Sequence, residues 1–431
     1  MAPTGQTVGA PGDASQQTAT AAFAEALRLL RTRRFGTFCF ASLLSNLGTW
    51  AQQVAEPWLL LTLGASSFLI GLDAFVMAAP AWILTLLGGV LADRTDRRRI
   101  ITICQSIQML CPAALVVLLL THTVTPWIVI GLSVVVGVTD ALSMPSFQSI
   151  VPSIVKRSQI ASALALNATQ FNLSRVLGPA LAGVMMASVG AIGCFSLSAV
   201  SYLPFIWVAL WILPRGKPRA AAETFGHDEL LAGFREIAAN RDLGGALLTV
   251  LLTSTLCGPL IVFCPVLIKS ALQRDVGDFS MAIAAFGIGG LCGAVALLGV
   301  GTGADRRRIS SWLARGYGLV MVLIALCPWF AALPALLALA GLAMTASNTS
   351  ANALLQGAAP PELRGQTISL YMLAMRGGLS VGSLVTGLSV SLFGVREALL
   401  VNGLVAVVAQ LVVAREWHRA AMPATISQTG A

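Results

Sequence analysis

Charged residues are scarce in this chain. Asp, Glu, Lys and Arg make up 10% of its 431 residues, whereas soluble domains carry about 25%. Hydrophobic residues make up 56%, so the folded chain could not cover its surface with polar groups in water. The scarcity of charge excludes an ordinary soluble domain and indicates an all-α polytopic membrane protein.

The residue patterns of catalytic and metal sites are also missing. The eight cysteines form no C-x-x-C pair, and each lies in or beside an apolar run, which indicates small buried hydrophobes and excludes a disulfide framework. The three histidines are scattered, so we expect no metal site and no cofactor. No G-x-x-x-x-G-K-[ST] loop and no nucleophile–base set occurs, so we expect no enzyme and no direct ATP hydrolysis.

The net charge of +9 comes from basic residues in the short loops between apolar runs. This is the positive-inside pattern, and it argues against a nucleic-acid partner. With both termini in the cytoplasm, only Lys269, Arg274 and Arg396 fall outside, and Arg175 and Arg376 fall within spans. The sequence therefore predicts a multi-pass protein of the inner (plasma) membrane with cytoplasmic termini.

The apolar runs predict twelve spans, because each is near or above the roughly 20 residues that cross a bilayer. They are 36–63, 67–92, 100–120, 125–147, 160–188, 192–213, 244–268, 279–300, 309–330, 333–356, 366–392 and 395–415. The predicted organisation is a disordered tail 1–30, a six-helix bundle 31–213, a linker 214–243 with a short surface helix at 228–237, a second bundle 244–415, and a tail 416–431. No signal peptide is expected at the N-terminus.

The two halves repeat each other. Gly178, Gly183 and Gly190 recur 204 positions later as Gly382, Gly387 and Gly394. A duplication of six helices predicts a central site between two pseudo-symmetric bundles that rock against each other.

The stretch between the second and third spans carries six charges within the seven positions 93–99. It reads G-x-L-A-D-R-x-x-R-R-R, and residues 301–308 echo it in the second half. With twelve spans in two sixes, this motif makes the chain similar to the major facilitator superfamily, which has a glycine where this chain has Asp96. The stretches 175–183 and 360–366, together with Met144-Pro145 and Pro152, resemble its bacterial branch of siderophore and macrolide exporters.

The resemblance implies a secondary active transporter, expelling small amphipathic molecules such as drugs, siderophores or metabolites in exchange for protons. We expect it to work as a monomer in the lipid bilayer. Uptake of a small solute by the same fold is the first alternative. A membrane-embedded enzyme or a non-transporting sensor is the second.

The motif predicts a gate. Asp93, at the end of the second span, can face the N-terminus of a helix, whose dipole favours anions; the resemblance nominates the eleventh span. Such contacts would hold the cytoplasmic side shut. The alternative is that the arginines only fix topology. The gating candidates are Gly89, Asp93, Arg94, Arg97, Arg98, Asp305 and Arg306.

Gly178, Pro179 and Gly183 in the fifth span allow two interpretations. Proline inside a span kinks it, which would place a bend at the pivot of the moving bundle. Small residues also let helices approach closely, which would be ordinary packing.

Ionisable residues within spans are costly unless they pair or face water. Glu56 and Asp73 should lie at a similar depth and are candidates for a proton or cationic-substrate site. Asp140 and Arg175 form a predicted pair, either structural or coupled to the gate. Arg376 could attract an anionic substrate or extend to the cytoplasm.

Polar and aromatic residues of the first, fifth and tenth spans supply candidates for the cavity wall. Asn348 and Asn352 are one turn apart and share a helix face, although interhelical hydrogen bonding explains most such residues. The cavity candidates are Trp50, Gln53, Trp58, Phe171, Asn348 and Asn352.

Overall fold

The structure is a computed structural model that describes residues 28–82, 84, 87, 91, 95–214, 240–298, 305–360 and 363–419. Several predictions lie outside these residues. They concern Gly89, Asp93 and Arg94 of the gating motif, most of both tails, the surface helix 228–237, and 301–304 of the second motif.

The regular secondary structure of the described residues is helical, with no strand among them. The helices are α2 (Arg33–Thr62), α3 (Ser67–Ala78), α5 (Arg97–Leu120), α6 (Pro126–Ile150), α7 (Ile160–Trp211), α9 (Arg241–Leu252), α10 (Pro259–Val266), α11 (Val276–Leu298), α12 (Arg306–Leu326), α13 (Leu333–Ala358), α14 (Arg364–Phe393) and α15 (Val395–Arg419). The π-helical turns Thr253–Cys257 and Leu267–Ala271 connect and extend α9 and α10.

Nine helices of the described part are long and apolar enough to cross a membrane, and Ser67–Trp82 is a shorter apolar helix. One of the nine, α7, has 52 residues, and its backbone leaves the helical conformation at Gly190. A span needs about 20 residues, so α7 is long enough to cross twice. The multi-pass helical architecture is confirmed, and the count of twelve spans stays a prediction.

Short polar residues begin several of these helices. Ser66 and Thr125 accept hydrogen bonds from the backbone N–H groups of Leu69 and Ile128, at 3.4 Å each. Asn240 does the same for α9, accepting from Asp242 and Leu243 at 3.0 and 3.3 Å. These side chains satisfy N–H groups that a helix leaves unpaired in its first turn.

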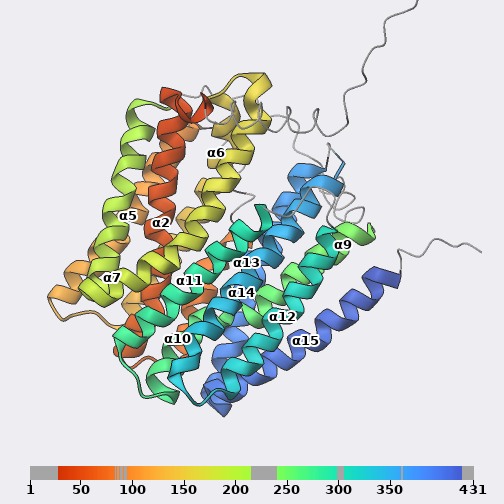
Figure 1. Cartoon of the computed structure of the whole chain (residues 1–431). Coiled ribbons are helices and arrows are strands. Elements are labelled where there is room, and N and C mark those ends of the chain that lie inside the picture. The colour runs from red at the N-terminus through yellow and green to blue at the C-terminus, as the bar shows by residue number, and fades with distance from the viewer. Residues whose placement is uncertain are drawn as a thin grey trace, which may run out of the picture.

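The helices form two bundles that meet at one end of the molecule and separate at the other (Figure 1). At the first end, which we call the closed end, one apolar cluster contains buried residues of both halves, from Trp58 and Phe195 to Phe279 and Leu337. At the other end, the open end, each described cluster of buried residues stays within one half. The larger ones lie around Phe35 and Phe205 in the first half and around Leu243 and Trp417 in the second half.

Small residues let the bundles approach closely along two helix pairs, α3 with α14 and α7 with α11. A Cβ atom on Gly183 would lie 2.5 Å from the carbonyl oxygen of Ser280, and one on Gly387 would lie 2.8 Å from that of Ser67. Because each glycine touches the opposite bundle, these two of the repeated glycines form equivalent contacts on the two sides of the interface.

Large apolar side chains cover the outside of both bundles. Trp211, Trp329 and Phe393 are 76%, 74% and 70% exposed. Such a surface would aggregate in water, and it is what hydrocarbon-facing helices present.

Candidate functional site

Two carboxylic acids are buried side by side in the first bundle. Glu56 of α2 and Asp73 of α3 are 3% and 4% exposed. The Ser133 hydroxyl of α6 donates to Glu56 Oε1 at 3.0 Å, and Asp73 lies beside both groups. The two acids are therefore neighbours, and the structure adds a hydroxyl beside them; their shared depth in a membrane stays a prediction.

Amide and hydroxyl groups extend this cluster. The Ser198 hydroxyl of α7 donates to Gln52 Oε1 at 2.8 Å, and Gln52 lies one turn before Glu56 on α2. Asp73 Oδ1 is buried with no hydrogen-bond partner among the described residues. A hydroxyl has one hydrogen to donate, so Ser133 satisfies only one of the two acids at a time when both are ionised.

Asp140 pairs across the interface between the bundles. Its partner is Arg376 of α14, so the prediction that Asp140 pairs with Arg175 is wrong. The Asp140 side chain is 39% exposed and that of Arg376 is 32% exposed. Arg175 of α7 also reaches α14, where its Nη1 lies 2.6 Å from Met375 Sδ.

Of the cavity candidates, Trp50 and Phe171 lie together in the first bundle. Their ring centroids are 6.3 Å apart in an edge-to-face arrangement, and both side chains are half-buried. Gln53, one turn from Trp50 on α2, is also half-buried. Asn46 donates to Gln170 Oε1 at 3.4 Å nearby.

In the second bundle the two asparagines of α13 differ. Asn348 is 4% exposed, and its Oδ1 has no hydrogen-bond partner among the described residues. Asn352 is half-buried and accepts a hydrogen bond from Gln356 at 3.1 Å.

Trp58 lies elsewhere, at the closed end, where it is 7% exposed. Its ring stacks on Phe279 of α11 with centroids 4.8 Å apart, and the Lys269 ammonium lies 5.9 Å from the ring centre. Trp58 sits near the end of α2 and Trp50 two turns earlier, so the helix carries them to different levels. In this structure Trp58 joins the bundles and does not share a surface with Trp50.

The described part of the first motif fastens helices within the first bundle. Asp96 begins α5 by accepting a hydrogen bond from the Arg98 N–H at 3.1 Å. Arg97 donates to the carbonyl oxygen of Ser149 at 3.3 Å, and Arg98 donates to that of Leu210 at the end of α7.

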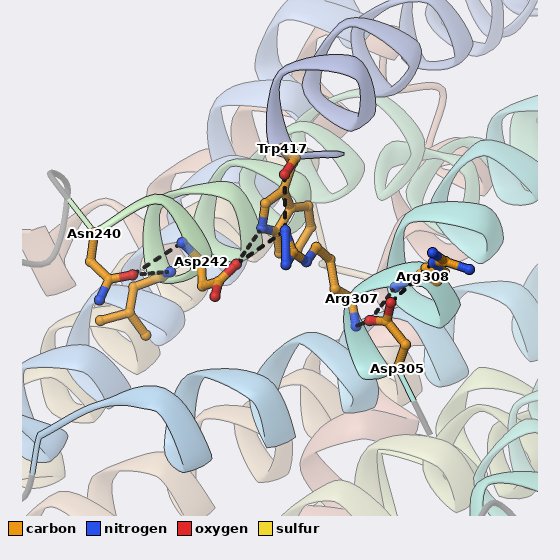
Figure 2. A network of polar contacts seen from close by, with 7 residues as sticks. Asn240, Asp242, Asp305, Arg307, Arg308 and Trp417 are labelled. Atoms are coloured by element: carbon orange, nitrogen blue, oxygen red, sulfur yellow. Dashed lines mark hydrogen bonds and ion pairs between the residues drawn. The ribbon is translucent and has the colours of Figure 1, made fainter. Parts of the chain in front are cut away.

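The second motif does the same in the second bundle (Figure 2). Asp305 begins α12 by accepting from the N–H groups of Arg307 and Arg308, at 3.1 and 3.2 Å. Arg307 donates to the Trp417 carbonyl oxygen at 2.9 Å and lies 3.4 Å from Asp242. The Trp417 indole N–H also donates to Asp242, at 3.1 Å, so the starts of α9 and α12 and the end of α15 are joined.

These contacts change the correspondence between the motifs. Both halves read D-R-R-R-I where a helix begins, at 96–100 and 305–309. Asp305 is therefore equivalent to the helix-capping Asp96, and not to Asp93. A gating role for Arg97, Arg98, Asp305 and Arg306 stays a prediction.

Gly178 and Gly183 make close helix contacts. A Cβ atom on Gly178 would lie 2.3 Å from the Trp50 Cβ. The α7 backbone is non-helical only at Gly190, so Gly178 and Pro179 lie within the helix. These contacts are those of packing, and a bend at this point during movement stays a prediction.

A family model described as transmembrane secretion effector (MFS_3) matches residues 24–428. The chain belongs to this family. It is a multi-pass transporter of the major facilitator superfamily, and not an enzyme. The resemblance of its motifs to this superfamily is thus confirmed.

Known relatives of this transporter are about 25% identical to it, and each match covers most of this chain and most of the relative. The staphyloferrin A transporter of Staphylococcus aureus is 24% identical and covers 85% of this chain and 92% of its own. The multidrug efflux pump Tap of Mycolicibacterium fortuitum is 25% identical, and the match covers 85% of this chain and 93% of the pump. The enterobactin exporter EntS of Salmonella typhi is 26% identical, with 84% and 87% covered.

Solved structures share the transporter's fold. The nucleoside transporter NupG superposes with a TM-score of 0.69 at 12% identity, covering 90% of this chain and all of its own. The inward-facing, occupied structure of a bacterial homologue of the human lysosomal transporter Spinster superposes with a TM-score of 0.65 at 16% identity. The match covers 90% of this chain and 96% of that chain. These likenesses confirm two pseudo-symmetric bundles in the major facilitator fold.

Several residues of the site carry no signal in the sequence. Ser133, Gln52 and Ser198 are each one of several polar residues in largely apolar helices, and Lys269 and Phe279 flank a short loop. Only the packing of four helices around Glu56 and Asp73 shows which polar residues face the acids.

Proposed function

We propose that this chain exports small amphipathic molecules from the cytoplasm in exchange for protons. The relatives support export, because their names include a multidrug efflux pump and an enterobactin exporter. The buried Glu56–Asp73 cluster is the observation that carries proton exchange. It places two acids around one hydroxyl with no cation beside them among the described residues.

Such a cluster can hold a proton between its members. If one acid is protonated, its O–H donates to Ser133 while Ser133 donates to the other acid, and every oxygen facing the hydroxyl is satisfied. Two ionised acids would repel each other in surroundings that solvate neither of them. Changing access from one side of the membrane to the other would load and release this proton.

The basic ends of the bundles support an orientation with both termini in the cytoplasm of the inner membrane. The described arginines 28, 31, 33 and 34 begin the first bundle, and Arg306, Arg307 and Arg308 begin α12 at the open end. In that orientation the structure is inward-open. We also propose that one chain is a working transporter, because in this fold the substrate site lies between the two halves of a single chain.

Transport into everted membrane vesicles tests this function. The substrates would be amphipathic dyes and antibiotics to which cells expressing the chain become resistant. We expect accumulation when the vesicle lumen is made acidic, and discharge of the pH gradient when substrate is added. Accumulation only with the opposite gradient would contradict export.

Glu56→Gln tests the acid cluster in the same vesicles. We expect it to keep exchange of labelled for unlabelled substrate while losing the response to the pH gradient. Asp278→Asn is the matched control, because Asp278 is a partly exposed acid that pairs with Arg274 at the closed end. A Glu56→Gln protein that still follows the pH gradient would remove the cluster from the mechanism.

A further inference from the structure

Two arginines reach from one bundle to the other in opposite directions. Arg175 extends from α7 of the first bundle to Met375 of α14. Arg376, the next residue of α14, extends back to Asp140 of α6. The three ionisable side chains carry two positive charges and one negative charge, so the group lacks an anion.

Arg175 is the arginine that is short of a partner. It is 8% exposed, and its Nε has no hydrogen-bond partner among the described residues. The neighbour of its Nη1 is a thioether sulfur, which is a weak acceptor. A guanidinium this deeply buried ordinarily forms bidentate bonds with a carboxylate or phosphate.

Arg376 has a partner that can be exchanged. Asp140 and Arg376 are each about one-third exposed, although both lie well inside their helices. Because they join the two bundles, their exposed faces border the space between the bundles. An ion pair that solvent reaches is weakly held, so another anion arriving from that space can replace Asp140.

An apolar surface lies next to Arg175 on α7. Phe171 is one turn before it and Gly178 nearly one turn after it, so the three share one helix face. Trp50 packs directly on Gly178 and meets Phe171 edge to face. An aromatic pair therefore lies on the same face of α7 as Arg175.

We propose that Arg175 and Arg376 bind the carboxylate of an amphipathic organic acid, with its apolar body against Trp50 and Phe171. Asp140 is the internal anion that holds Arg376 until this substrate replaces it. The proposal rests on the transport function above and names the chemical class of the substrate.

Equilibrium binding to the full-length protein in lipid nanodiscs tests the proposal. The probes are dansylglycine and dansylglycinamide, which share a fluorescent aromatic body and differ in one carboxylate. Energy transfer from tryptophan to dansyl reports binding, and empty nanodiscs correct for partition into lipid. We expect the wild type to bind dansylglycine at least tenfold more tightly than the amide.

Three variants separate a binding role from a structural one. Arg175→Gln and Arg376→Gln should each weaken dansylglycine binding tenfold or more and leave the amide unchanged. Asp140→Asn should tighten dansylglycine binding about threefold, because the competing anion is gone. Arg396→Gln is the control: its guanidinium binds the carbonyl oxygens of Ala325 and Cys327, and we expect no change.

Three results would overturn the proposal. They are equal binding of the two probes, no binding of dansylglycine to the wild type, and an Asp140→Asn protein that binds dansylglycine more weakly. The last would show that the Asp140–Arg376 pair only ties the bundles together. The measurement uses no gradient, so failure here leaves proton-driven export standing, and failure of the vesicle experiment leaves this binding site standing.

Discussion

The two bundles share their mechanical parts. Asp96 and Asp305 begin equivalent helices, and Arg98 and Arg307 bind the carbonyl oxygens of Leu210 and Trp417 at the ends of equivalent helices. Gly183 and Gly387 each touch the opposite bundle. The two halves therefore share the features that hold each bundle together and those that bring the bundles into contact.

The interiors of the bundles differ. The first contains the buried charged residues Glu56, Asp73 and Arg175, whereas the buried polar residues described in the second are hydroxyl and amide side chains. There, Gln410 donates to the Thr249 carbonyl oxygen and to Thr253 Oγ1, at 3.0 and 3.1 Å. We therefore propose that the shared features serve the movement of the bundles and that the unshared charges of the first bundle couple transport to its energy source.

The shared glycines give the prediction with the largest effect. Gly183→Leu and Gly387→Leu should each force the bundles apart at the closed end, since a Cβ would already lie within 2.5–2.8 Å of backbone oxygen. Overpacking costs about 1–3 kcal/mol, or roughly 5- to 150-fold in a two-state equilibrium. Distances between spin labels at Thr123→Cys and Ser270→Cys in a cysteine-free protein would measure the opening.

The control for these variants is Gly131→Leu, because a Cβ at Gly131 meets open space. If only one of the two glycine variants opens the closed end, the two interface contacts are not equivalent.

The next prediction concerns the buried polar residues in which the two bundles differ. Asp73→Asn should lower pH-driven transport about tenfold or more, since the cluster then lacks one of its two acids. Gln410→Leu, its counterpart in the second bundle, should lower stability by about 1–3 kcal/mol and leave the pH response intact. Vesicle transport with imposed gradients and thermal denaturation in detergent would measure both. Equal loss of pH response in the two variants would contradict the division of roles.

A third, smaller effect is expected from Trp58→Ala. The variant loses the stack on Phe279 that joins the bundles, and such a stack contributes about 0.5–1.5 kcal/mol beyond its buried area. We expect the closed end to open several-fold more often in the spin-label measurement. Trp211→Ala, which removes a tryptophan that is 76% exposed, should leave the distances unchanged; an equal shift would show that the stack does not matter.

The smallest effects should come from the helix caps. Asp96→Ala and Asp305→Ala should each cost about 1 kcal/mol of stability, because each removes a side chain that satisfies N–H groups of a first turn. Thermal denaturation should show similar losses in the two bundles, and Asp96→Asn and Asp305→Asn should restore most of them. A loss of transport without a loss of stability in Asp305→Ala would instead support a gating role.

Sequence reasoning succeeded where a pattern runs along the chain. Apolar runs and the repeated glycines gave the helices and the two related halves, and counting residues predicted a similar depth for Glu56 and Asp73, which lie beside each other in the structure. Counting gives depth but not direction around the helix axis, so it could not decide whether Arg175 or Arg376 faces Asp140. The correspondence of Asp305 with Asp96 became clear only from the hydrogen bonds at the starts of α5 and α12.

Gly190 and Gly394 adopt φ angles of 68° and 99°, where other residues are strained. Gly190 interrupts α7, and Gly394 alone separates α14 from α15. Each pair of helical segments is thus joined through one glycine with no loop between them. A displacement of one segment should therefore move the other directly. An epitope tag inserted at Gly190 or Gly394 should abolish transport. The same tag inserted at 121–124, in the loop between α5 and α6, should leave transport intact.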